Sequence, residues 1–210
     1  MRHGLLAVLS LVMVALVGCG GPGQTIPISP DIKAAQDPPK VRSAPRVAVV
    51  PFEDVRADKT AIGRHQHYVE TNVDRFVPLE GSASDQVTKF VVEYLKKAEI
   101  PVTLLEGTQA PPDIADVIMT GEIESYWIEA LTRFGRTELR SKNRLRIKLT
   151  NLSDGSTTQA TVGGEATTKV VSFSHADLEK LTGEALGQSL ARFLGDLTVF
   201  DRSFKPKRED

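Results

Sequence analysis

Cysteine is almost absent from this sequence, because only Cys19 among 210 residues carries a thiol. A single thiol cannot form an intrachain disulfide, which excludes a disulfide scaffold and a cysteine-rich metal protein. An excess of charge of one sign is also missing, since 26 basic residues face 27 acidic ones. Without a basic field, we expect no nucleic-acid partner. Cys19 therefore needs an explanation of its own.

The residues before Cys19 have the layout of a secretory signal. Arg2 and His3 precede an apolar run from Leu5 to Val17. This run is shorter than the roughly 20 residues that a helix needs to cross a bilayer, so a cleaved signal is favoured over a permanent span. We predict a signal peptide over residues 1–18. The alternatives are an ordinary secretory signal with an accidental cysteine, and a buried core helix.

The stretch Leu16-Val17-Gly18-Cys19 resembles the lipobox of bacterial lipoproteins. In those proteins the cysteine receives a diacylglyceryl group and becomes the new N-terminus after cleavage, here after Gly18. The resemblance implies lipid attachment at Cys19, and several acyl chains on one residue anchor a protein durably. Gly20 stands where an Asp would retain an enteric-type lipoprotein in the inner membrane. The resemblance thus implies an outer-membrane protein that faces the periplasm.

Composition divides the rest of the chain into three parts. Residues 19–45 are rich in Gly and Pro without apolar periodicity, which predicts a lipidated cysteine followed by a disordered tether. Residues 46–204 have the length and apolar content of a single periplasmic α/β domain. Residues 205–210 form a charged tail.

Hydrophobic periodicity in residues 46–204 predicts an α/β (α+β) fold with a single mixed sheet. The elements follow the order β-α-β-β-β-β-α, with two helices packed on one face of the sheet. The helices begin at two capping boxes, Ser82 with Asp85 and Ser174 with Asp177. The clearest strands lie at 46–52, 102–105, 115–131, 143–152 and 157–168.

The loop over residues 53–81 leaves the carboxyl end of the first strand, where open α/β sheets place their ligands. Asp54 and Arg56 can pair locally, and Gly63 can supply a backbone turn that other residues resist. These three residues are candidates for partner binding. The alternative, which we favour, is that they fold the loop onto the edge of the sheet.

A second candidate for partner binding is the connection around Gly135, at the tip of a long hairpin. Phe134 and Arg136 flank that glycine. An exposed aromatic side chain beside an arginine has the composition of an interaction hot spot. A plain loop in which Phe134 turns back is the favoured alternative.

Residues that suggest enzyme chemistry have simpler interpretations. His65 and His67 would share one side of an extended segment, but a metal site needs further ligands, for which Glu70 is the nearby candidate. We therefore expect a solvated loop there and no metal. Residues 172–179 contain Ser, His and Asp together, which a capping box explains without catalysis. We predict no catalytic residues and no cofactor.

Charged residues alternate along two predicted neighbouring strands. Glu122 and Glu124 occupy one face of the first, while Arg144, Arg146 and Lys148 occupy one face of the second. We expect ordinary surface ion pairs, worth about 0–1 kcal/mol each, rather than a charged face that binds a ligand.

Three stretches together resemble the YajG-type putative lipoproteins. They are "VAVVPFEDVRADKTAIG" from Val47, the helix end "YLKKAEIPV" and the strand "ADVIMTGEIESYWIE" from Ala115. The resemblance implies a fold similar to the amino-terminal domain of TolB, shared with activators of peptidoglycan synthases and the curli secretion lipoprotein. It also implies a binding or assembly role, and it brings no catalytic residues.

We therefore expect a non-enzymatic, membrane-anchored lipoprotein that binds another protein of the cell envelope. A flexible tether raises the local concentration of such a module near its target. A second hypothesis is a self-assembling structural or secretion-complex lipoprotein, and either version allows a homo-oligomer. A third is a hydrolase or metal-dependent enzyme with a site around His65, His67 and Glu70.

Overall fold

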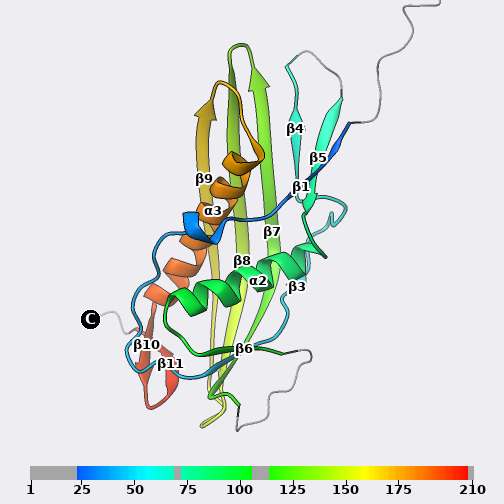
Figure 1. The fold of residues 1–210 in the computed structure, drawn as a ribbon. Coiled ribbons are helices and arrows are strands. Elements are labelled where there is room, and N and C mark those ends of the chain that lie inside the picture. Colours follow the sequence, from blue (N-terminus) through cyan, green and yellow to red (C-terminus); the bar gives the residue numbers. More distant parts are fainter. Residues whose placement is uncertain (1–22, 69–71, 106–113, 208–210) are drawn as a thin grey trace, which may run out of the picture.

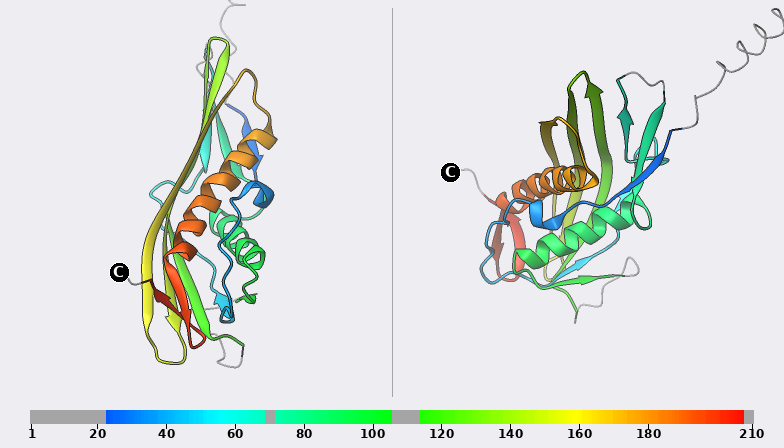
Figure 2. Two further views of the ribbon diagram at one scale, coloured as in Figure 1. Left: turned by 90° about the vertical axis from the view of Figure 1, so that its left-hand side faces the viewer. Right: turned by 45° about the horizontal axis from the view of Figure 1, so that its top comes forward.

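The computed structural model describes residues 23–68, 72–105 and 114–207. Within these ranges a nine-stranded mixed sheet carries two α-helices, and a two-stranded hairpin follows the second helix. Both helices cover the same face of the sheet, which is elongated along its central strands (Figures 1 and 2). The predicted α+β architecture, with two helices on one face, is confirmed.

The sheet strands are β1 (Thr25–Ile28), β2 (Val47–Val49), β3 (Glu53–Asp54), β4 (Gly63–Gln66), β5 (Val73–Pro78), β6 (Val102–Leu104), β7 (Val117–Arg133), β8 (Arg136–Asn151) and β9 (Thr157–Val170). The helices are η1 (Ile32–Ala34), α2 (Ala83–Lys97) and α3 (His175–Gly195). Strands β10 (Leu197–Phe200) and β11 (Ser203–Pro206) form the separate hairpin.

Strand β7 organises the sheet because it is paired on both sides. On one side it forms a long antiparallel ladder with β8, which in turn pairs with β9. On its other side it pairs in parallel with β2, then β3, then β4 along its length. Strand β2 also pairs in parallel with β6, as the strand-helix-strand pattern predicts. Strands β7, β8 and β9 correspond to those predicted at 115–131, 143–152 and 157–168, and β8 and β9 are longer than predicted.

Both helices begin at the predicted capping boxes. Ser82 and Ser174 each accept a hydrogen bond from the backbone N–H three residues on, and the carboxylates of Asp85 and Asp177 bond back. Helix α3 lies close to β9 because Gly164 has no side chain. A Cβ there would lie 1.9 Å from the Ala185 carbonyl oxygen. A small residue at this position of β9 therefore admits the helix.

Residues 23–45 differ from the predicted disordered tether, since they belong to the folded unit. Strand β1 pairs in parallel with β5, and the Ile28 side chain is fully buried. The Asp31 N–H donates to the Glu179 carbonyl at 2.9 Å, which ties the segment to α3. Two alternating isoleucines, Ile26 and Ile28, are too few to produce a periodic signal, so the Pro-rich composition concealed a strand.

Two further boundaries also differ from the prediction. The segment 53–81, predicted to be a loop, contains β3, β4 and β5. Residues 205–207 of the predicted tail belong to the domain, because β11 extends to Pro206 and the Lys207 N–H bonds to the Asp196 carbonyl at 2.9 Å, while 208–210 lie outside the described residues. The strands in these segments have only two to six residues, and pairing with a neighbouring strand, rather than their own pattern, makes them strands.

Candidate functional site

One end of the sheet gathers segments that are distant in sequence. Gln66 on β4 pairs with Leu131 on β7, and Thr137 on β8 pairs with Val170 on β9. The terminal residues of β4, β7 and β9 therefore reach the same level, next to the β7–β8 turn. Figure 1 shows these strand ends together at the top, with β10 and β11 at the opposite end.

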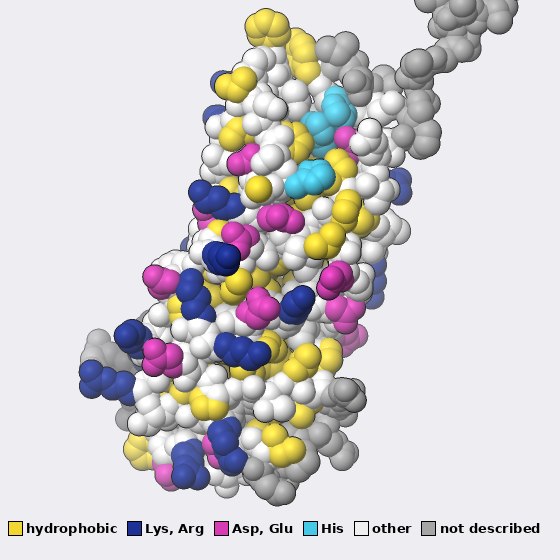
Figure 3. All heavy atoms as spheres, in the orientation of Figure 1, with side chains coloured by type: hydrophobic (Ala, Val, Ile, Leu, Met, Phe, Trp, Pro, Cys, Tyr) yellow, Lys and Arg dark blue, Asp and Glu magenta, His cyan; other side chains and the backbone are white. Residues whose placement is uncertain are grey.

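Exposed apolar side chains lie at this end. Phe134 in the β7–β8 turn is 88% exposed, Val171 after β9 is 84% exposed and Tyr68 after β4 is 57% exposed. We call these three residues the apolar rim. Gly135 has φ of +71°, which forms the predicted turn. The favoured alternative, in which Phe134 turns back, is wrong. Hydrophobic side chains occupy the upper tip of the molecule in Figure 3.

Arginines flank the most exposed residue of the rim. Arg133 and Arg136 pair across the last rung of the β7–β8 ladder, and both are exposed. The predicted neighbourhood of Phe134 and Arg136 at a projecting tip is therefore present. An exposed aromatic residue with arginines close by in the turn suits a surface that is apolar at its centre and polar around it.

The chain enters the domain at the same end of the sheet. Gln24 precedes β1, its N–H donates to the Asp74 carboxylate at 2.7 Å, and its carbonyl accepts from the Arg75 N–H at 2.8 Å. Gly23 packs so closely on β5 that an added Cβ would lie 2.0 Å from the Val73 carbonyl oxygen. Gly18 and Cys19 lie outside the described residues.

Behind the rim, two histidines and an aspartate converge. His65 on β4 lies directly opposite Asp74 on β5 in the antiparallel register. Its Nδ1 is 3.3 Å from Asp74 Oδ2, and His67 Nε2 is 2.8 Å from the same oxygen. His65 and Asp74 are both 7% exposed. The predicted solvated loop is therefore wrong: His65 is buried in a strand. Glu70 lies outside the described residues.

The carboxylate of Asp74 is held in its ionised form. Burial by itself would raise the pKa of this carboxyl, but the Gln24 N–H and His67 bond to it and hold its pKa below the usual range. Asp74 is the member of this cluster that the sequence did not reveal. The sequence feature that could have revealed it is the alternation of β5, in which Asp74 and Phe76 share the buried face.

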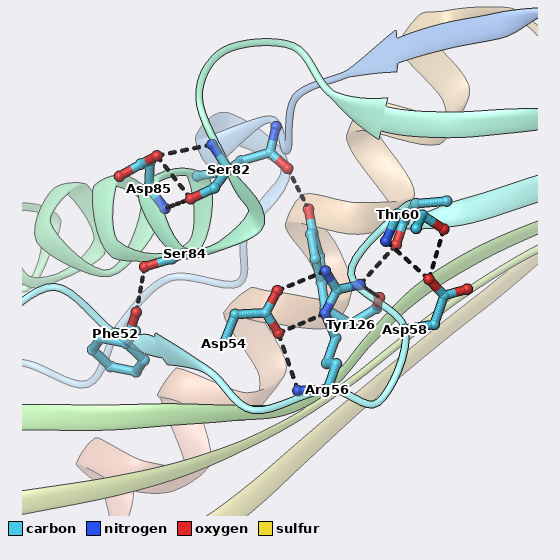
Figure 4. A network of polar contacts seen from close by, with 11 residues as sticks. Phe52, Asp54, Arg56, Asp58, Thr60, Ser82, Ser84, Asp85 and Tyr126 are labelled. Carbon is cyan, nitrogen blue, oxygen red and sulfur yellow. Dashed lines mark hydrogen bonds and ion pairs between the residues drawn. The ribbon is translucent and has the colours of Figure 1, made fainter.

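Asp54 and Arg56 form a different kind of cluster (Figure 4). Arg56 is 7% exposed, and its Nε and Nη2 donate to the two oxygens of Asp54 at 2.9 and 2.8 Å. Its Nη1 donates to the carbonyls of Ala61 and Tyr126 at 2.9 and 3.2 Å. The guanidinium thus joins the β3–β4 connection to β7. This arrangement matches the favoured structural interpretation.

Gly63 acts through close packing and not through a turn. It lies within β4, opposite Ile128 of β7, and a Cβ there would be 2.1 Å from the Ile128 carbonyl oxygen. The expectation of a special backbone turn is therefore wrong. Asp54, Arg56 and Gly63 all serve to attach the β3–β4 segment to β7, whereas Phe134 and Arg136 lie at the exposed tip.

The charged face of the long hairpin carries the predicted ion pairs. Arg146 bonds to both Glu122 and Glu124, and Arg144 Nε lies 2.8 Å from Glu124. Lys148 is exposed on the same face of β8. The paired side chains are 20–64% exposed, so each pair contributes about 0–1 kcal/mol.

Edge strand β9 is partly covered by α3. Arg192 Nη1 donates to the Gly163 carbonyl at 2.7 Å, and the Glu165 N–H donates to Gln188 Oε1 at 3.4 Å. These backbone groups bond to helix side chains and not to β8. Covering an edge in this way limits pairing with other strands.

No helix among residues 23–68, 72–105 and 114–207 combines the length and apolar character that a membrane span requires.

Comparisons with known proteins give remote structural similarities. No family model and no curated protein matches the sequence. Protein XCC0632 from Xanthomonas campestris, a DUF330 protein, aligns with a TM-score of 0.47 and 14% identity over 83% of this chain and 91% of its own. The PelC dodecamer from Paraburkholderia phytofirmans aligns with a TM-score of 0.44 and 14% identity over 74% and 92% of the two chains.

A third similar structure is lipoprotein GNA1162 from Neisseria meningitidis. It aligns with a TM-score of 0.34 and 9% identity over 63% of this chain and 89% of its own. Scores and identities this low support no argument about function. The resemblance to YajG-type proteins stays a prediction.

Proposed function

We propose that this protein is a non-enzymatic, lipid-anchored module of the bacterial cell envelope, which binds or assembles another envelope component beside the membrane. The anchor is the lipidated Cys19, and the membrane is the outer one, with the domain in the periplasm. One observation supports this function best: Gln24, just before β1, bonds to Asp74 at the end of the sheet that carries the apolar rim.

The reach of the chain limits how far the domain stands from its anchor. Cys19 and Gly23 are four peptide units apart. A peptide spans at most about 3.6 Å per residue, so this connection reaches no more than about 14 Å. The predicted long tether would have left the orientation free. With a short connection, the rim end of the sheet would face the lipid surface.

The chemistry of the rim suits that surface. Phe134 and Tyr68 are aromatic, and aromatic side chains favour the boundary between acyl chains and headgroups. Arg133 and Arg136 extend beside Phe134 and can pair with anionic headgroups. Contact of the rim with lipid would add a second attachment to the acyl anchor, and would hold the long hairpin upright for a partner.

Metabolic labelling with a clickable fatty acid tests the anchor. The native chain should incorporate the label and fractionate with outer membranes, and Cys19→Ala should lose both properties. Label that persists in Cys19→Ala, or its absence from the native chain, contradicts the lipoprotein assignment.

Photo-crosslinking tests the orientation. A photoreactive residue at position 134 of the labelled protein should capture lipid, and the same residue at the exposed position Lys148 should capture protein or nothing. Capture of one protein from position 134 would instead make the rim a protein-binding hot spot. Capture of one recurrent protein from position 148 would identify the envelope partner.

A second candidate function is self-assembly through β9. Strand β9 runs for 14 residues and pairs only with β8 among the described strands. The bonds from Arg192 and Gln188 oppose this candidate near Gly163. Sedimentation of the detergent-solubilised chain distinguishes the two functions, since Arg192→Ala should increase association only if β9 is the assembly edge.

A further inference from the structure

We infer that His65, His67 and Asp74 form a binding site for one divalent transition-metal ion, of which Zn²⁺ is the best match. The inference is independent of the lipid anchor, because it depends only on side chains within the folded domain. Each residue presents one ligand atom, and these three atoms lie within 4.8 Å of one another.

Strand register explains why these residues meet. His67 lies one residue beyond the end of β4, and its ring contacts that of His65, with centroids 3.9 Å apart. Asp74 sits directly opposite His65 on the neighbouring strand. A buried imidazole and carboxylate on the inward face are costly unless they are paired or bound to a metal, and they replace apolar side chains that would stabilise the sheet more simply.

The separations between ligand atoms fit a small tetrahedral site. Metal–ligand bonds of about 2.0–2.1 Å place neighbouring ligand atoms about 3.3 Å apart in a tetrahedron. His65 Nδ1 and Asp74 Oδ2 are 3.3 Å apart. His67 Nε2 is 2.8 Å from the same oxygen, and all three ligand atoms lie within 4.8 Å of one another, so binding an ion requires a small adjustment of the His67 ring. The His67 side chain is 28% exposed, which lets a solvent molecule supply the fourth ligand.

Outer hydrogen bonds orient two of the three ligands. The other oxygen of Asp74 accepts from the Gln24 N–H at 2.7 Å. His65 Nε2 lies 2.9 Å from Thr132 Oγ1, and that hydroxyl lies 3.0 Å from Thr137 Oγ1. Such partners fix ring orientation and tautomer in metal sites. The His65 ring also meets Phe173 edge-on, with centroids 4.8 Å apart.

The donor set selects the metal. Two imidazoles and one carboxylate suit Zn²⁺ with an open fourth position, and they suit Mg²⁺ or Ca²⁺ poorly because those ions prefer oxygen ligands.

The position of the site gives the metal a structural consequence. It joins β4 to β5 and, through the Gln24 N–H, fixes the backbone at the start of β1. Figure 3 shows histidine side chains reaching the surface toward the same end of the molecule as the rim. A bound ion would thus stiffen the end of the sheet at which the chain enters.

Zinc titration of the full chain in detergent tests the site. The protein carries a histidine-free tag, is stripped with EDTA and is then titrated by calorimetry. We expect one Zn²⁺ per chain. His67→Gln and Asp74→Asn should weaken binding by about 100-fold or more, the upper range for loss of an outer partner. His175→Gln is the matched control, because His175 is exposed at the start of α3 and should bind zinc like the native chain.

Two further measurements keep the test decisive. Co²⁺ in place of Zn²⁺ should give the visible absorption of a four-coordinate ion in the native chain and not in His67→Gln. Saturating zinc should raise the unfolding temperature by about 5–10 °C in the native chain alone. Circular dichroism confirms that each variant is folded. Absence of zinc binding by the native chain, or equal binding by His67→Gln and Asp74→Asn, would overturn the inference and leave a hydrogen-bonded cluster only.

Discussion

Two charged clusters lie on the same stretch of chain, residues 53–81, and they differ in where their polar atoms point. In the cluster of Arg56, each bonded guanidinium nitrogen donates to a carboxylate or a carbonyl that is fixed by the fold. In the cluster of Asp74, two imidazoles converge on one carboxylate oxygen. The first arrangement attaches a connecting segment to the sheet. The second brings three possible metal-ligand atoms within 4.8 Å of one another. Burial alone does not separate structure from function, but the direction of donors and acceptors does.

The largest effect should come from removing the Arg56 guanidinium. Arg56→Met leaves Asp54 without its partner and two carbonyls without a donor, so the free energy of unfolding should fall by about 3–5 kcal/mol. Urea denaturation measures this loss. Arg64→Ala is the control, because Arg64 pairs with Glu129 in solvent and should change stability by about 0–1 kcal/mol. Equal losses in the two variants would contradict the structural role of Arg56.

Gly63→Ala should have the next largest effect. The new methyl group would meet the Ile128 carbonyl, and separating β4 from β7 should cost about 1–3 kcal/mol. This change also displaces His65, so zinc affinity should fall together with stability. Gly195→Ala is the matched control, since nothing lies within 4 Å of a Cβ there. A neutral Gly63→Ala would mean that the two strands separate without cost.

The pH dependence of stability should follow Asp54. Burial raises the pKa of this carboxyl, but hydrogen bonds and charge from Arg56 outweigh it and hold the pKa below its usual value. A folded pKa below the unfolded one contributes stability above the unfolded value of about 3.9, and this contribution disappears as the pH falls through the folded pKa. The free energy of unfolding of Asp54→Asn should therefore be lower than that of the native chain at pH 7, and the two values should converge below about pH 4. A constant difference across pH, measured by urea denaturation, would exclude this linkage.

The smallest effect on stability should come from the histidine cluster without metal. His67 is partly exposed, so His67→Gln should cost about 1 kcal/mol in EDTA. Thr132→Val should weaken zinc binding by about 10–100-fold while keeping all three ligands, because Thr132 orients His65. Unchanged zinc affinity in Thr132→Val would remove that positioning role. The two clusters differ most clearly if Arg56 governs the free energy of unfolding and Thr132 governs the affinity for zinc.

Local patterns predicted several features correctly. Both capping boxes, the turn at Gly135 and the ion pairs of Arg146 with Glu122 and Glu124 follow from residues that interact within a turn or across one ladder. The candidate site was less predictable. His65 and His67 were visible as a pair, but Asp74 joins them only because β4 and β5 align in one register.

The sequence by itself determined the helix starts, the alternation of the long strands and the lipobox-like motif, because each depends on neighbours in the chain. Only the tertiary structure decided that β1 is a strand, that Arg56 is buried and that the apolar rim lies beside the point where the chain enters. These features depend on partners many residues away. Short polar segments become strands when a neighbouring strand satisfies their backbone hydrogen bonds, and no local pattern records that neighbour.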